Sequence, residues 1–212
     1  AEGKEKLAPG DALTLFLSQD TMEGFAKQGE LLPYEEAYST LKGVQVLYED
    51  AHVIIVNKPS GILSQKAAPK DLSLNEWLLG YLLAKGDWDP KQPAAFKPSV
   101  CNRLDRNTSG LVMGAKSMAG SQMLGSLLQS RRIRKFYRML VKGRVMREKS
   151  LDGYLVKDET GNKVRLIQKE APDAVYIKTR YYPLACVGDV TLVEAELITG
   201  KTHQIRIHLA SE

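Results

Sequence analysis

Cysteine and histidine are scarce in this sequence, and long apolar runs are missing. The 212 residues include two cysteines, Cys101 and Cys186, and three histidines. The cysteines are far apart, fit no zinc-binding spacing and have apolar neighbours, as small buried hydrophobic residues do. No cysteine or carboxylate stands at ligand spacing from the histidines, so we expect neither a disulfide nor a metal site.

No apolar stretch approaches the roughly 20 residues that span a bilayer, and no basic-then-apolar leader opens the chain. The sequence therefore predicts a cytoplasmic protein without membrane association. Its composition, 43% hydrophobic and 26% charged, is that of an ordinary globular chain. A chain of this length can form one sizeable domain, with or without a short appendage, and needs no disulfides to do so.

Charge is unevenly distributed, although its net value is only +5. Residues 1–50 contain ten acidic and four basic residues, a net charge of −6, whereas residues 51–212 contain 15 acidic and 26 basic residues, a net charge of +11. The densest basic run is residues 131–138, which Lys142 and Arg144 follow closely. Such a run suits binding to a polyanion, but an isolated run is more often a solvated surface.

The chain divides into an acidic lead-in, residues 1–43, and a main domain, residues 44–212, where β-rich runs begin. We expect an α+β domain built on a mixed, mostly antiparallel central sheet flanked by helices and loops. The order of residues 111–141 is that of a strand–helix–strand (βαβ) unit, and residues 201–210 fit both helical and strand periodicity. The expected strands are 44–48, 52–56, 111–115, 136–141, 153–156, 164–168, 175–182 and 190–197, and the expected helices are 74–84 and 117–130.

Residues 102–110 place a carboxylate, Asp105, between Arg103 and Arg106, in a stretch rich in turn-forming residues. A surface aspartate in a capping loop is the ordinary explanation. The two arginines favour the ionised carboxylate. A catalytic Asp105 would therefore act as a nucleophile or stabilise charge, rather than donate a proton.

Two further segments carry groups suited to chemistry or RNA binding. Tyr137 stands among cations on an expected strand, which suits base stacking beside phosphate contacts as well as an ordinary place in the core. Towards the end of the chain, Arg206 lies between His203 and His208. The preceding Thr-Gly-Lys-Thr of residues 199–202 is not a phosphate-binding loop, because Ala195 occupies the position of its first glycine.

These three segments, in this order, resemble the RluA-type pseudouridine synthases. That family reads His-Arg-Leu-Asp-x-x-Thr-Ser-Gly in its catalytic loop, Lys-x-Tyr in a strand that ends near Val-x-Gly, and Leu-x-Thr-Gly-Arg/Lys-Thr-His-Gln-Ile-Arg-x-His. The resemblance covers residues 44–210 and is more specific as a set than any single motif. The matching residues are 103–105 with 108–110, 135–137 with 141–143, and 197–208, and residues 53–61 resemble the start of the family's domain.

The resemblance implies a pseudouridine synthase catalytic domain, an isomerase that uses neither a cofactor nor a metal. Asp105 would attack a flipped uridine, with C1′ of the ribose as the favoured position, and the released uracil would turn and rejoin through its C5. Tyr137 would stack on the base, and Arg206 would pair with Asp105. The final segment would be helical after its glycine turn.

The resemblance also implies how RNA is bound. Arg103 would fill the gap left by the flipped base, and other residues would contact the RNA near the site. The expected partner of this monomer is a structured RNA, ribosomal RNA first and transfer RNA second. The expected RNA-binding residues are Arg103, Arg131, Arg132, Arg134, Lys135, Lys201 and His203.

The sequence departs from the family pattern at Asn102, where the family usually has histidine. It also stops at Glu212, where relatives continue, so we expect a catalytic domain cut short at its C-terminus, and residues 13–17 resemble the last strand of an S4-type RNA-binding domain. These departures leave an alternative, a catalytically impaired RNA-binding module of the same fold. A glycosidase-like hydrolase is a third hypothesis, but it needs a second carboxylate that the motifs do not offer.

Overall fold

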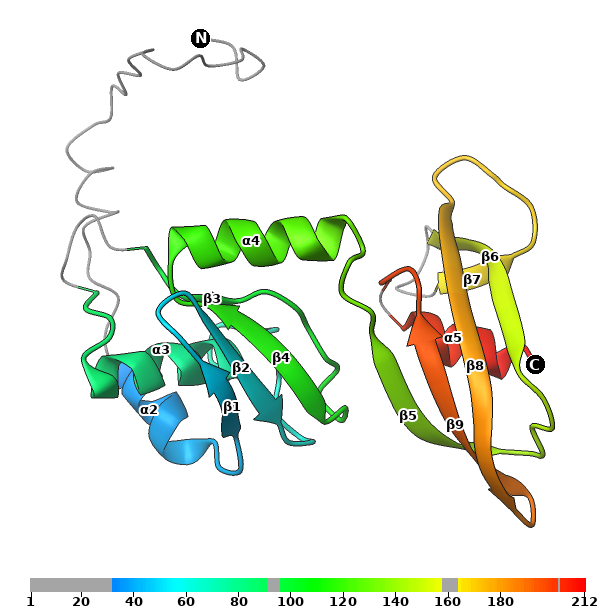
Figure 1. Ribbon diagram of the computed structural model, residues 1–212, viewed down its shortest axis with the longest axis horizontal. Coiled ribbons are helices and arrows are strands. Elements are labelled where there is room, and N and C mark those ends of the chain that lie inside the picture. Colours follow the sequence, from blue (N-terminus) through cyan, green and yellow to red (C-terminus); the bar gives the residue numbers. More distant parts are fainter. Residues whose placement is uncertain (1–31, 91–95, 158–163, 202) are drawn as a thin grey trace, which may run out of the picture. The chain divides into compact units, whose positions relative to one another are not determined.

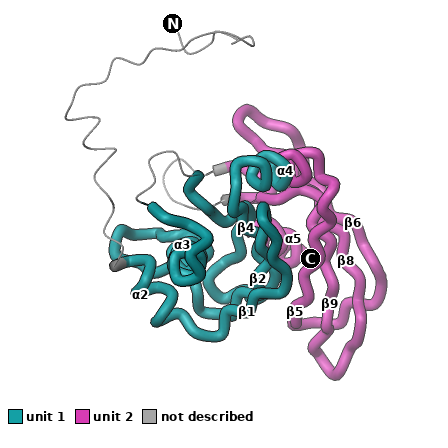
Figure 2. The backbone as a smooth tube through the Cα atoms, turned by 60° about the vertical axis from the view of Figure 1, so that its left-hand side comes forward, with its two compact units in different colours: residues 1–125 teal, residues 126–212 magenta. Residues whose placement is uncertain are grey.

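The computed structural model describes residues 32–90, 96–157, 164–201 and 203–212. The chain forms two compact units, residues 1–125 and 126–212 (Figure 2). The first contains a four-stranded sheet and the second a five-stranded sheet (Figure 1). Every pairing between these strands is antiparallel, which confirms the expected α+β class.

The sheet of the first unit has the strand order β1-β2-β4-β3. The two strands expected near residues 44–56 form an antiparallel hairpin at its edge, and Asp50 closes the turn by accepting hydrogen bonds from the backbone N–H groups of His52 and Val53 at 2.7 and 2.8 Å. An aspartate in this position satisfies turn amides that the ladder leaves open. The strands are β1 (Gln45–Glu49), β2 (Val53–Lys58), β3 (Ser99–Val100) and β4 (Gly110–Ala115).

One face of this sheet is covered by helix α3 (Leu74–Lys85), which was expected from its periodicity. Ser73 caps its first turn by accepting from Asn75 N, and Gly86 ends it in the left-handed region at φ 75°. Helix α2 (Leu32–Thr40), which was not expected, packs against α3. The helices meet at Gly80, where an added Cβ would lie 2.1 Å from the carbonyl oxygen of Tyr34.

The other face of the same sheet packs against helix α4 (Met118–Gln129), which begins in the first unit and ends in the second. Leu124 of this helix joins Val53 and Ala115 in a small buried cluster. Gly120 permits the close approach, since a Cβ there would lie 2.1 Å from the carbonyl oxygen of His52. The alternation along β2 therefore serves two cores, one on each face.

The second unit is a sheet of order β5-β9-β8-β6-β7. Helix α5 (Gln204–Ala210) lies against one face (Figure 1), where Ile205 and Leu209 pack on a core that includes Val193. The helical form that the resemblance implied for this segment is thus confirmed. The strands are β5 (Phe136–Lys142), β6 (Lys149–Lys157), β7 (Val164–Ile167), β8 (Val175–Val187) and β9 (Val190–Leu197).

Two expectations were wrong. Strands β4 and β5 do not form a βαβ unit, because β5 pairs with β9 over its whole length and belongs to the other sheet. Cys186 is exposed near the end of β8 rather than buried, since the strand runs beyond its core there, whereas Cys101 is half-buried. Both cysteines are free thiols.

Some sequence expectations concern parts of the chain outside these elements. Residues 13–17, which resemble the last strand of an S4-type domain, lie outside the described residues. The boundary at residue 43 stays a prediction, although α2, which precedes it, packs within the first unit. Within the described part of the chain, no helix is long and apolar enough to cross a membrane.

Candidate functional site

Asp105 lies in the loop that connects β3 and β4 of the first unit. Its side chain is half-buried, whereas those of Arg103 and Arg106 are exposed. A turn follows it, because the backbone N–H of Thr108 donates to the carbonyl oxygen of Asp105 at 3.0 Å. The carboxylate therefore stands on a defined turn between two exposed cations.

Beneath this loop lies a buried cation that the sequence did not single out, Lys58 at the end of β2. Its ammonium donates to the carbonyl oxygens of Pro59 at 3.0 Å, Ile62 at 2.8 Å and Arg106 at 3.1 Å. Three acceptors satisfy the three protons of an ammonium. Burial lowers the pKa of Lys58, and the negative charge of Asp105 opposes that shift.

The segment that follows Lys58 binds the backbone on both sides of Asp105. Ser64 Oγ donates to the carbonyl oxygen of Leu104 at 2.7 Å and accepts from its N–H at 2.9 Å. Beyond Asp105, Gly61 N donates to the carbonyl oxygen of Arg106 at 2.8 Å. The loop that carries Asp105 is thus fixed through the peptide groups on both sides of this residue.

Asn102, the departure from the family pattern, has a definite structural role. Its Oδ1 accepts from Met113 N at 2.7 Å, and its Nδ2 donates to the carbonyl oxygen of Leu111 at 3.2 Å. The amide thereby continues the pairing of β3 along β4 after the short strand has ended. An asparagine can do this because it has both a donor and an acceptor.

The other two expected catalytic residues, Tyr137 and Arg206, belong to the second unit. Tyr137 lies on β5, opposite Ala195 of β9, and its half-buried side chain shares a strand face with Lys135 and Met139. Helix α5 covers that face, and it carries the exposed Arg206. The expected set is therefore divided between the units, with Asp105 in the first.

Helix α5 is anchored by a buried polar network that the sequence did not reveal. The amide of Gln204 is fully used: Nε2 donates to Thr179 Oγ1 and to the carbonyl oxygen of Lys178, both at 2.9 Å, and Oε1 accepts from Thr199 Oγ1 and Lys201 N at 2.9 and 3.1 Å. Four such bonds fix both the height and the rotation of the helix on the sheet.

The same network continues to His208, one turn further along α5. Its Nδ1 lies 2.9 Å from Thr179 Oγ1, which already accepts from Gln204 and so has its own proton available for the imidazole. Its Nε2 is buried and has no hydrogen-bond partner among the described residues. Burial lowers the pKa of His208, against the opposing charges of Asp152 and Glu212.

The expected RNA-binding arginines differ in their surroundings. Arg134 Nε donates to Glu196 at 2.8 Å, and its guanidinium lies 4.8 Å from the ring centre of Phe136. Arg138 is paired in the same way with Glu194 at 2.9 Å. Cross-strand pairs of this kind stabilise a sheet, so part of the basic run has a structural use.

The remaining expected RNA-binding residues of the second unit are largely exposed. Arg131 and Arg132 follow α4, and Lys201 and His203 lie at the start of α5. His203 and Arg131 both have left-handed backbones, at φ 57° and 58°. Only Lys135 of this group is half-buried.

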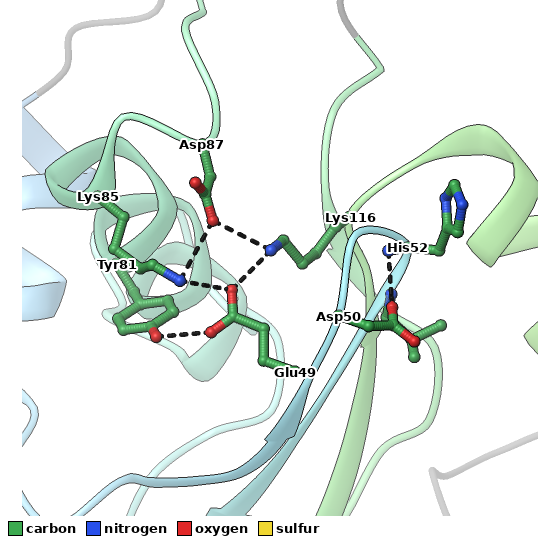
Figure 3. Close-up of polar contacts among 8 residues, drawn as sticks. Glu49, Asp50, His52, Tyr81, Lys85, Asp87 and Lys116 are labelled. Carbon is green, nitrogen blue, oxygen red and sulfur yellow. Dashed lines mark hydrogen bonds and ion pairs between the residues drawn. The ribbon is translucent and has the colours of Figure 1, made fainter.

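A separate polar cluster ties β1, α3 and β4 together at their ends (Figure 3). Lys116 Nζ lies 2.6 Å from Glu49 and 3.0 Å from Asp87, and Lys85 Nζ lies 2.9 and 3.3 Å from the same two residues. The charges of the two lysines and the two carboxylates balance, so the cluster has no net charge with which to attract an anion or a cation. In the described part of the chain, no three His, Cys, Asp or Glu side chains are grouped as metal ligands would be.

Residues 52–211 match the family of the RNA pseudouridylate synthases. The match covers well over half of the chain, so the protein belongs to this family, and the resemblance to the RluA-type enzymes is confirmed.

Three relatives illustrate the similarity. The chain is 36% identical over 156 residues to an RNA pseudouridine synthase of Chloroflexus aurantiacus, covering 72% of this chain and 46% of that protein. It is 31% identical over 164 residues to ribosomal large subunit pseudouridine synthase C of Vibrio cholerae, covering 77% and 48%. It is 28% identical over 209 residues to synthase D of Nitrosomonas europaea, covering 98% and 55%. The chain thus spans about half the length of these relatives.

Two solved structures share the fold. The human RNA pseudouridylate synthase domain containing 4 superposes with a TM-score of 0.65 at 21% identity, over 85% of this chain and 68% of that one. The human domain containing 1 gives 0.62 at 20% identity, over 81% and 66%. At such identities the likeness establishes the fold.

Proposed function

We propose that this chain carries the catalytic centre of an RNA pseudouridine synthase that acts on ribosomal RNA. The observation that carries the proposal is the placement of Asp105, half-buried on a loop whose peptide groups are bound on both sides by Lys58 and Ser64. A nucleophile must be held in a fixed geometry to react efficiently. Two relatives are named ribosomal large subunit pseudouridine synthases, which supports ribosomal over transfer RNA.

In the proposed reaction a carboxylate oxygen of Asp105 bonds to C1′ of a flipped uridine as the bond from C1′ to N1 breaks. The electron pair of that bond stays on the uracil, which turns so that its C5 bonds to C1′ and displaces the carboxylate. Loss of the C5 proton and protonation of N1 complete an isomerisation in which no atom is lost. Extruding the base costs a few kcal/mol of stacking, which the pocket must offset.

The other expected residues have supporting roles in this proposal. Tyr137 stacks on the uracil and takes part in removal of the C5 proton, and Arg206 pairs with Asp105. Arg103, exposed beside Asp105, fills the gap left by the flipped base. Arg131, Arg132, Arg134, Lys201 and His203 contact the RNA near this site, and the protein works as a cytoplasmic monomer.

The test is the substitution Asp105→Asn, which keeps the shape of the side chain and removes its charge. We expect pseudouridine formation on ribosomal RNA to be lost while RNA affinity stays within about twofold, since phosphate contacts dominate that affinity. Asp173→Asn is the matched control, because Asp173 is exposed and its left-handed backbone, at φ 60°, also suits asparagine. Full activity of the Asp105→Asn protein would disprove the proposal.

Two other outcomes separate the remaining hypotheses. A catalytically impaired RNA-binding module would bind RNA with a strong salt dependence and give no product with the wild-type chain. It is not favoured, because Asn102, one of the two departures that motivated it, is well accommodated between β3 and β4. A hydrolase would release free uracil, which the isomerase retains.

A further inference from the structure

Lys135, just before β5, is a half-buried cation for which the described part of the chain provides no counter-charge. No residue in the described ranges accepts a hydrogen bond from its ammonium or lies within ion-pair distance of it. Burial lowers the pKa of Lys135, and the positive charge of Arg131 lowers it further. Removing an ammonium from water without compensation is costly, so the site is suited to receive an anion.

The position of the ammonium is defined by Gly200. A Cβ on Gly200 would lie 3.0 Å from Lys135 Nζ, which is closer than such atoms ordinarily approach. Gly200 does not have a positive φ, so its backbone conformation does not require glycine. What matters at this position is the absence of a side chain. The absence of a side chain leaves room for the ammonium beside the turn that leads into α5.

Neighbouring cations on the same strand do not share this property. Arg134 and Arg138 lie on the opposite, exposed side of the strand, and each is paired with a glutamate of β9, at 2.8 and 2.9 Å; Glu196, the partner of Arg134, also pairs with Arg180 at 3.7 Å. Lys135 instead faces the side that carries Tyr137, two residues along the strand. Residues two apart in a strand are separated by about 7 Å, roughly the length of one nucleotide.

We propose that Lys135, placed beside Gly200, binds a backbone phosphate of the nucleotide whose base stacks on Tyr137. This inference rests on the proposed function and deepens it, because it assigns one phosphate to one residue. Arg131 adds a second positive charge near the same oxygen atoms. The paired arginines, Arg134 and Arg138, contribute little to phosphate binding in comparison.

The test combines a protein substitution with a change in the RNA. Short stem-loop RNAs containing a uridine that the wild-type chain modifies are made with one neutral methylphosphonate at each position around that uridine. Their affinities are measured with wild-type protein, with Lys135→Met, and with Lys169→Met as an exposed lysine control from the same unit. The substitution Lys135→Arg keeps the charge.

We expect one methylphosphonate position to weaken wild-type binding about tenfold and to leave Lys135→Met unaffected, since the lost contact is the same in both. The Lys169→Met and Lys135→Arg proteins should respond as wild type does. The salt dependence of binding by Lys135→Met should also fall by about one counterion. Equal unfolding midpoints in urea establish that Lys135→Met is folded.

Three results would overturn the inference. One is that every position affects wild type and Lys135→Met alike, and another is that Arg134→Met, rather than Lys135→Met, removes the effect. The third is tight binding of inorganic phosphate, abolished by Lys135→Met, without any coupling to RNA, which would make a free anion the ligand. If the wild-type chain forms no pseudouridine on any RNA, the proposed function fails instead, so the two failures are distinguishable.

Discussion

Lys58 Nζ donates a hydrogen bond, at 3.1 Å, to the carbonyl oxygen of Arg106, the residue that follows Asp105. The two residues are 48 positions apart in the chain, so the bond joins the end of β2 to the loop after β3. The ammonium is buried and also donates to the carbonyl oxygens of Pro59 and Ile62, so it anchors the loop to the end of β2.

Replacing Lys58 with methionine should therefore affect both stability and rate. The substitution leaves three carbonyl oxygens without their donor, and we expect a loss of about 3 kcal/mol in the free energy of unfolding, measured in urea. Where the protein still folds, kcat should fall more than KM rises, because the position of Asp105 changes while RNA contacts remain. The exposed Lys66→Met is the control, and equal effects of the two changes would contradict the role given to Lys58.

Asn102 should tolerate some substitutions better than others. Asn102→Asp keeps an acceptor for Met113 N–H but loses the donor to Leu111, whereas Asn102→Ala loses both. We expect the alanine variant to lose about 1–2 kcal/mol of stability and the aspartate variant less. Urea unfolding and single-turnover rates give the comparison, and a more stable alanine variant would show that the amide does not support β4.

Gln204 and Thr179 should behave as a coupled pair. Gln204→Leu and Thr179→Val each break the network under α5, and the double variant should cost less than the sum of the two, by about 1 kcal/mol or more. Thr179→Ser retains the hydroxyl and should recover most of the loss. If the network positions Arg206, kcat should fall at unchanged KM in both single variants, and additive effects on stability would disprove the coupling.

The lowered pKa of the buried His208 leads to a prediction of how the free energy of unfolding depends on pH. Its pKa in the folded chain lies below the unfolded value of 6.5, so the unfolded chain binds the proton first as the pH falls. The contribution of neutral His208 is complete above pH 6.5 and decreases below it, by up to about 1.4 kcal/mol per pH unit, until the folded pKa is reached.

Unfolding in urea at about pH 8 and about pH 5, followed by circular dichroism, measures this loss. In a His208→Gln variant the part of the pH dependence due to this residue should disappear. The carboxylates Asp152 and Glu212 act in the opposite direction, and they remain in both proteins. A variant with the same pH dependence as wild type would exclude His208 as the source.

Local patterns in the sequence predicted most of the strands and two of the helices. Strand β9 begins and ends where expected, because the pattern that marks it lies within the strand itself. Helix α2 was missed because its stabilising partner is not local: its contact with α3 depends on the absence of a side chain at Gly80. The pairing of β5 with β9 was missed for the same reason, since strand order along the chain does not determine pairing over about 50 residues.

In the candidate site, too, some residues could be proposed from the sequence and others could be found only in the folded chain. Asp105, Tyr137 and Arg206 were identified because the resemblance rests on motifs. Lys58 was not, since a lysine in a sequence is ordinarily exposed, and only the folded chain shows the carbonyl groups that surround it. The separation of Lys135 from the paired Arg134 likewise depends on which strand face each occupies.

The bonds that fix the loop around Asp105 involve the peptide groups of Leu104, Arg106 and Asn107, while the side chains of Arg106 and Asn107 are exposed. Mutations at positions 106 and 107 can therefore accumulate without displacing the carboxylate. The side chains on this rim of the loop are therefore separable from the peptide bonds that hold Asp105 in place.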